Sequence, residues 1–132
     1  MTSDYTVKTG PQFDKEFKKL SSRCPSLPSD FDRLKTALLV DLKRNPRLQG
    51  KYLQIPRLGQ NVKFPVFKIK KFRCKAIPKG NRSGFRFIFI LSRKHKLVYF
   101  TECYYKTSDD KKENVNRIKK ICINYQKYFF KS

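Results

Sequence analysis

The middle of this sequence lacks acidic residues. No aspartate or glutamate lies between Asp41 and Glu102, although this segment holds 17 of the 32 lysines and arginines. A solvated charged surface normally mixes both signs, and this segment does not. The formal net charge of +22 also exceeds what solubility requires. We therefore expect a polyanion or a strongly acidic protein as partner, with nucleic acid first among these.

Histidine is rare, and paired cysteines are missing. His95 is the single histidine, and no C-x-x-C pair occurs among the four cysteines, which are Cys24, Cys74, Cys103 and Cys122. This pattern argues against the common zinc sites, so we expect no metal and no cofactor. The last three cysteines fall in apolar strand or helix patterns, where a reduced thiol behaves as a small hydrophobe. We therefore expect reduced cysteines in a cytoplasmic protein.

A long apolar run is also missing. The N-terminal residues MTSDYTVKTG lack the apolar stretch of a signal peptide, and the longest apolar run is too short to span a bilayer. We therefore expect no membrane partner. A chain of 132 residues suits one domain and can bury a sizeable core.

The residues that are present predict an α+β fold in the order α-α-β-β-β-α. Apolar stripes at helical spacing predict a helix within residues 11–22 and a second helix that opens at residues 26–30 and stops at Asn45-Pro46, followed by a connecting loop over residues 47–63. A final helix is expected over residues 115–125, with Glu113 in the same helical segment. Strands are predicted for the segments rich in aromatic and β-branched residues, which are residues 64–74, 85–91 and 97–105.

The stretch KGNRSGFRFIFIL, residues 79–91, places cations and two glycines ahead of the most apolar run. Arg86 interrupts this buried strand, and an arginine stays charged at any ordinary pH. It must therefore reach water, an acidic side chain or an anionic ligand. A salt bridge to Glu102 on the next strand is the structural alternative to a ligand contact. Gly80 and Gly84 would let the preceding backbone turn tightly.

Three short motifs follow one another: KIK at residues 68–70, KGNRSGFR at 79–86 and YYK at 104–106. In order and spacing they resemble the K-I-R strand, the K-G-K-S-G-G-x-R element and the Y-x-K of the RelE/ParE superfamily of bacterial toxin-antitoxin toxins. The resemblance implies a single RelE-like domain over residues 1–132, with a core of about 11–125. In that fold two N-terminal helices and a C-terminal helix accompany a small antiparallel sheet.

The resemblance also implies a function. Many superfamily members are endoribonucleases that cleave mRNA on the ribosome through attack by the 2′-hydroxyl, and an acidic antitoxin neutralises them. Others inhibit DNA gyrase and cut nothing. A gyrase-directed toxin or a non-catalytic basic RNA-binding protein would need the same basic face, so both alternatives stay open.

The resemblance assigns catalysis to Arg86, Lys68 and Lys70. The planar fork of an arginine can hold two phosphate oxygens, and lysines in this strand would contact phosphate and transfer protons. Strand periodicity places both lysines on one face and Phe67 and Ile69 on the other, so we expect one face to be core and one to bind. The expected RNA-contacting residues are Lys71, Arg73, Lys75, Lys79, Arg82, Tyr104, Tyr105 and Lys106.

The sequence leaves several alternatives open. The lysines can instead belong to a solvated sheet face, and a bulge in the strand would exchange which of them face the ligand. A lysine crowded by cations can have its pKa lowered enough to act as a base. The catalytic tyrosine or histidine that several members carry after the last strand has no obvious equivalent here, although Tyr125 or Tyr128 could substitute. His95 is expected in a surface loop.

Overall fold

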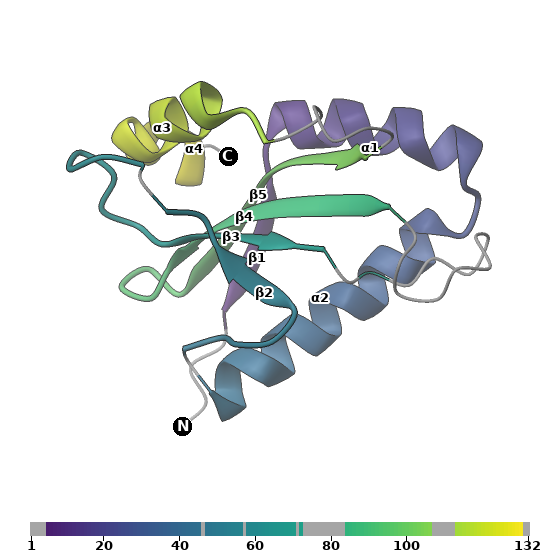
Figure 1. Ribbon diagram of the computed structural model, residues 1–132, viewed down its shortest axis with the longest axis horizontal. Coiled ribbons are helices and arrows are strands. Elements are labelled where there is room, and N and C mark those ends of the chain that lie inside the picture. Colours follow the sequence, from purple (N-terminus) through teal and green to yellow (C-terminus); the bar gives the residue numbers. More distant parts are fainter. Residues whose placement is uncertain are drawn as a thin grey trace.

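Five strands form one mixed sheet in this computed structural model, which describes residues 5–45, 47–56, 58–70, 72, 84–106 and 113–130 (Figure 1). The sheet order is β1-β5-β4-β3-β2. Within the described residues the elements are β1 (Thr6–Thr9), α1 (Pro11–Arg23), α2 (Leu27–Arg44), β2 (Tyr52–Gln54), β3 (Val66–Ile69), β4 (Phe85–Ser92), β5 (Leu97–Tyr105), α3 (Val115–Ile123) and α4 (Tyr125–Phe129).

The sheet is larger than the sequence pattern predicted. β4 and β5 pair antiparallel where strands were expected, and β3 is shorter than its predicted segment. β2 extends one edge from within the expected loop, and β1 extends the other edge. Because β1 runs parallel to β5, the expectation of a purely antiparallel sheet is wrong.

α1 and α2 cover one face of the sheet (Figure 1). A proline in the first turn opens each helix, a position where its missing N–H costs nothing. Phe13 and Phe31 project from the two helices onto the sheet, where the Phe31 ring lies 5.3 Å from that of Phe87 and the Phe13 ring 5.5 Å from that of Phe100. Burial of these rings supplies much of the driving force for docking the helices.

α3 and α4 cover part of the opposite face. Ile118, Ile121 and Phe129 from these helices share a second core with Ile88 and Ile90 of β4. The alternation of β4 explains this arrangement, since its phenylalanines point to the first core and its isoleucines to the second. The expectation that one face is core and the other binds is therefore wrong over much of the sheet, because both faces are buried there.

Two smaller findings complete the fold. Cys24 and Cys103 lie in the first core and Cys122 in the second, whereas Cys74 lies outside the described residues. Burial raises the pKa of the Cys122 thiol to about 12, so this group stays protonated at neutral pH. Among the described helices, none has both the length and the apolar content needed to cross a membrane.

Candidate nucleic-acid interface

Arg86 is the second residue of β4. It lies at the end of the sheet where β3 ends and β4 begins. It pairs across the strands with Tyr104 of β5. Its Nη1 donates to the carbonyl oxygen of Phe85 at 3.2 Å and to that of Lys70 at 3.4 Å. Two backbone carbonyls therefore position this guanidinium, and its side chain is half-buried.

The salt bridge proposed between Arg86 and Glu102 does not form. Glu102 stands opposite Ile88, and its two carboxylate oxygens accept from the backbone N–H of Asn114 at 2.9 Å and from Arg117 Nη1 at 3.1 Å. The structural alternative, a strand-end ion pair between Arg86 and Glu102, is therefore wrong.

A carboxylate, an amine and a phenol meet on the same face as Arg86. Lys68 Nζ lies 2.6 Å from Glu113 Oε1, and Tyr104 also hydrogen-bonds to the Glu113 carboxylate. The side chains of Lys68 and Glu113 are 21% and 13% exposed, so water reaches this contact only partly. We call Arg86, Lys68, Tyr104 and Glu113 the Arg86 cluster.

The surroundings set the protonation of two members of this cluster. Burial is the largest single influence on Glu113 and opposes its ionisation, but the hydrogen bond and charge of Lys68, a backbone N–H and Tyr104 together outweigh it and hold the pKa of Glu113 below its ordinary value. Burial, reinforced by the negative charge of Glu113, raises the pKa of Tyr104 to about 12, although Arg86 acts in the opposite direction. At neutral pH Glu113 is therefore an anion, and Tyr104 is a proton donor.

Sequence reasoning missed Glu113 because it placed this residue in the final helical segment. The residue instead precedes α3, whose N-cap is Asn114, with the Asn114 Oδ1 accepting from the Arg117 N–H at 3.0 Å. Asparagine is a preferred N-cap, so Asn114 was the available signal that Glu113 lies outside the helix. Lys68 therefore contacts a carboxylate, which differs from the cation-crowded setting expected for a lysine base.

The remaining predicted residues are only partly brought together. Lys70 is exposed directly after β3, and the Lys106 N–H donates to the Gly84 carbonyl at 2.9 Å, at the same end of the β4–β5 pair as Arg86. Tyr105 instead packs against Phe85, with ring centroids 5.2 Å apart, on the sheet face opposite Tyr104. Five predicted contacts lie outside the described residues: Lys71, Arg73, Lys75, Lys79 and Arg82.

Gly84 performs the role expected of it. Its φ of +97° is one that other residues rarely adopt, and a Cβ there would lie 3.0 Å from the Tyr105 ring. A glycine at this position therefore lets the chain enter β4 beside Tyr105. Gly80, the other glycine of the motif, lies outside the described residues.

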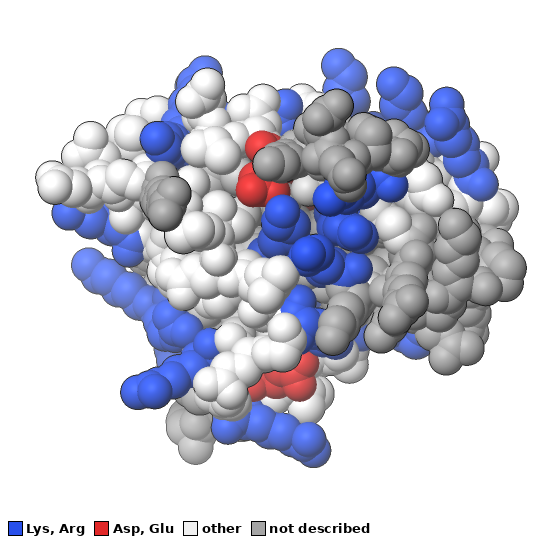
Figure 2. All heavy atoms as spheres, in the orientation of Figure 1, with Lys and Arg blue, Asp and Glu red and all other residues white. Residues whose placement is uncertain are grey.

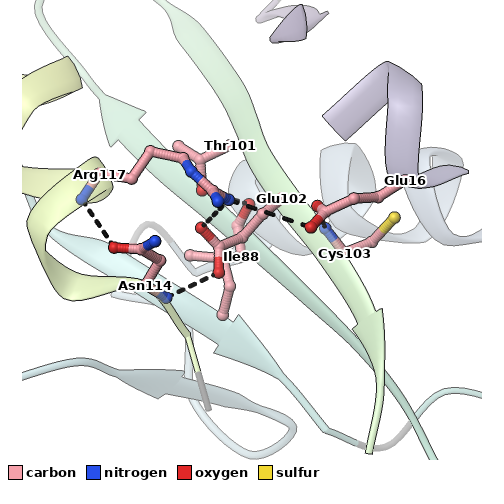
Figure 3. A network of polar contacts seen from close by, with 7 residues as sticks. All are labelled: Glu16, Ile88, Thr101, Glu102, Cys103, Asn114 and Arg117. Carbon is pink, nitrogen blue, oxygen red and sulfur yellow. Dashed lines mark hydrogen bonds and ion pairs between the residues drawn. The ribbon is translucent and has the colours of Figure 1, made fainter. Parts of the chain in front are cut away.

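A second polar network fixes α3 beside the Arg86 cluster (Figure 3). Arg117 of α3 bonds to Glu102 and lies 4.0 Å from Glu16 of α1, and Glu16 in turn accepts from the Cys103 N–H at 3.1 Å. The Glu16 carboxylate thus accepts a hydrogen bond from a backbone N–H of β5, beyond the β5 residues that pair with β1. The network includes the N–H of the N-cap Asn114, which donates to Glu102, so it also restrains the backbone next to Glu113.

Figure 2 shows lysine and arginine side chains gathered in the middle of this face, over the central strands, with acidic side chains at two edges of the group. Tyr125 and Tyr128, the possible catalytic substitutes, are not part of it. Tyr125 packs against Phe64 near the β4–β5 turn, and Tyr128 lines a hollow beside β1.

No group of three or more potential metal ligands occurs within the described ranges.

No protein-family model matches the chain, and no curated protein matches it either.

Proposed function

We propose that this chain is a RelE-like toxin, an endoribonuclease that cleaves mRNA on the ribosome in the cytoplasm and is neutralised by an acidic partner protein. The observation that carries this proposal is the Arg86 cluster, in which a fixed guanidinium lies beside a carboxylate, an amine and a phenol. The order of the KIK, KGNRSGFR and YYK motifs supports it, as does the absence of acids between Asp41 and Glu102.

Cleavage of RNA by its own 2′-hydroxyl requires a proton acceptor, a stabiliser of phosphate charge and a proton donor. The ionised Glu113 would accept the 2′-hydroxyl proton as O2′ attacks phosphorus. Arg86 and Lys70 would bind the non-bridging oxygens as charge develops on them. The P–O5′ bond then breaks, and Lys68 or Tyr104 would give O5′ its proton. The products are a 2′,3′-cyclic phosphate and a free 5′-hydroxyl.

These roles extend the assignment made from sequence. Lys68 changes from a candidate base to a candidate acid, because its amine contacts the carboxylate that would act as the base. Arg86 keeps its predicted phosphate role, and the guanidinium suits it because a planar fork can bind two oxygens at once.

Induction of the protein in bacteria tests the proposal. We expect mRNA to fragment before DNA replication stops, with 2′,3′-cyclic phosphate at the new ends. Arg86→Ala should slow cleavage by about a hundredfold to a thousandfold, the usual cost of losing one transition-state contact. Arg86→Lys should recover activity only in part, because a point charge lacks the two-pronged geometry.

The melting temperature of the same Arg86→Ala preparation separates a ligand contact from a structural one. We expect it to stay within a few degrees of wild type, because the guanidinium contacts only strand-end carbonyls among the described residues. A destabilised but still active Arg86→Ala protein would rule out the catalytic role. Arrest of DNA replication with intact mRNA would instead support the gyrase-directed alternative.

A further inference from the structure

A second hollow lies at the other end of β4, and the proposed cleavage chemistry does not use it. Three segments line this open cavity of about 640 Å³: the residues before β3, the end of β4 with the turn after it, and the junction of α3 with α4. The rings of Phe64, His95 and Tyr125 line it, one from each segment. We call it the His95 pocket.

The rings of the His95 pocket are tilted against one another. Phe64 and Tyr125 meet nearly edge to face, with centroids 5.1 Å apart and planes at 69°, and His95 lies 5.6 Å from Tyr125 at 41°. The Ser92 Oγ holds the imidazole in place, at 2.7 Å from His95 Nδ1, and accepts from the His95 N–H at 3.2 Å. His95 is therefore a half-buried, oriented ring, whereas sequence reasoning expected only a surface residue.

Among the described residues that line the pocket, the charged side chains are all cationic. Lys63, Arg93 and Lys94 are exposed at its rim. All three lining segments come from parts of the sequence without acids, residues 42–101 and 114–132. Cations around aromatic walls are the combination with which proteins bind single-stranded nucleic acid, where bases stack on rings and phosphates meet lysine and arginine.

We propose that the His95 pocket binds one unpaired base of a single-stranded nucleic acid, with the flanking phosphates on Lys63 and Lys94. A stacked or paired base cannot enter, because a neighbouring base or its pairing partner covers its faces or edge. Arg86 and Ser92 are six residues apart on β4, a separation of about 20 Å, so one strand can contact both sites. This inference does not depend on cleavage.

Photo-cross-linking tests the proposal without requiring activity. Single-stranded oligomers of about ten nucleotides, a length within known single-strand site sizes, would carry one 5-iodouracil. One oligomer is DNA and the other is 2′-O-methyl RNA, so neither has the free hydroxyl needed for cleavage. We expect cross-links to Phe64, His95 or Tyr125, identified by peptide mass spectrometry. A preference for one oligomer would tell which nucleic acid the pocket selects.

Two variants and a matched control measure affinity for the same oligomers. His95→Ala should weaken binding about fivefold or more, the lower end for loss of one stacking contact. Lys94→Ala changes an exposed turn residue, so it should keep the fold and weaken binding with a smaller salt dependence. Lys43→Ala is the control, because Lys43 is an exposed lysine on α2, which covers the other sheet face. If His95→Ala does not fold, the affinity of Lys94→Ala and the positions of the cross-links still show whether the His95 pocket binds the oligomers.

Three results would overturn the proposal. Cross-links confined to Tyr104 and Tyr105 would place the base at the Arg86 end alone. Unchanged affinity in both His95→Ala and Lys94→Ala would show that the pocket does not contribute. Self-association of the protein that His95→Ala abolishes, together with unchanged oligomer binding, would make the pocket a contact between copies of the chain. Loss of RNA cleavage in Arg86→Ala with intact cross-links would leave the proposal standing.

Discussion

At the scale of single residues, the chemistry of Glu113 depends on its neighbours. A lone glutamate next to the basic surface of this chain could be a solvated counter-charge, but here Lys68 contacts it and Tyr104 hydrogen-bonds to it in a partly buried setting. The contact with Lys68 has two effects. It stabilises the ionised carboxylate, and it ties the start of α3 to β3. The proposed base is therefore also a structural contact, and its two roles must be measured separately.

We predict that Glu113→Gln lowers the stability of the protein near neutral pH but not in strong acid. The pKa of Glu113 lies below its ordinary value of 4.5 in the folded protein. The stabilisation it provides is therefore complete above pH 4.5 and disappears as the pH falls through the folded-state pKa. At pH 7 we expect a loss of about 2 kcal/mol in the free energy of unfolding, typical of a hydrogen bond to a charged group.

Urea unfolding of both proteins at pH 7 and pH 3 measures this difference. Asp32→Asn provides the control, because Asp32 pairs with Lys35 while its side chain is 73% exposed. A surface pair of this kind contributes less than about 1 kcal/mol at either pH. An equal loss in Glu113→Gln at both pH values would show that the carboxylate charge does not stabilise the fold.

At the scale of elements, α3 is joined to β5 and α1 by one arginine. Arg117 contacts Glu102 and Glu16, and the Glu102 side chain is only 4% exposed (Figure 3). Burial raises the pKa of Glu102, while the Asn114 N–H and Arg117 oppose that rise. Removal of the arginine would leave a buried carboxylate with one backbone donor.

We therefore predict that Arg117→Ala destabilises the protein by about 3 kcal/mol, as expected when one partner of a buried pair is removed. Thermal or urea unfolding measures the loss, and Lys120→Ala on the exposed side of the same helix should cost little. Arg117→Leu combined with Glu102→Leu should recover most of the stability, because no unpaired charge then remains. A loss in the double variant as large as in Arg117→Ala would indicate that packing, rather than charge, holds α3.

The elements also show how far the sequence could predict this fold. α1 and α2 have apolar stripes at helical spacing, β4 and β5 are runs of at least eight residues rich in aromatic and β-branched side chains, and all four were predicted. β1 and β2 have four and three residues, too few to show alternation, and each depends on pairing with a distant strand. The packing of α3 on the sheet was missed for a similar reason. Its contact with the isoleucines of β4 joins residues that lie far apart in the sequence.

The site was predictable to a different extent. Arg86 could be singled out because a cation inside an apolar strand pattern needs a reason, whereas Lys68 was assigned from the KIK motif and the resemblance that it supports. Glu113 could not be assigned to Lys68, because the two lie on separate elements and their contact follows from the path of the chain before α3. Tyr104 and Tyr105 were indistinguishable in sequence, and strand alternation places them on opposite faces of the sheet.

At the scale of the whole molecule, several of the few acids are used inside the fold. Glu102 binds Arg117, Glu113 binds Lys68 and Asp41 accepts from the Tyr52 hydroxyl at 2.5 Å. With 32 cationic and 10 acidic side chains, most cations remain without a counter-charge. Such a surface repels itself and binds polyanions without selectivity, so an acidic partner would serve to cover it.

We predict that the acidic partner proposed above binds over the Arg86 cluster and that its association is strongly salt-dependent. Electrostatic steering raises association rates by about 10-fold to 1000-fold, and salt screens it. The association rate, measured by stopped-flow mixing, should therefore fall by about tenfold or more from low to high ionic strength. Lys70→Glu places an opposing charge beside Arg86 and should weaken binding, whereas Lys43→Glu on α2 makes the same charge change on the other face and should have little effect. Equal losses in the two variants would mean that net charge alone attracts the partner, and an affinity independent of salt would exclude this mode of neutralisation.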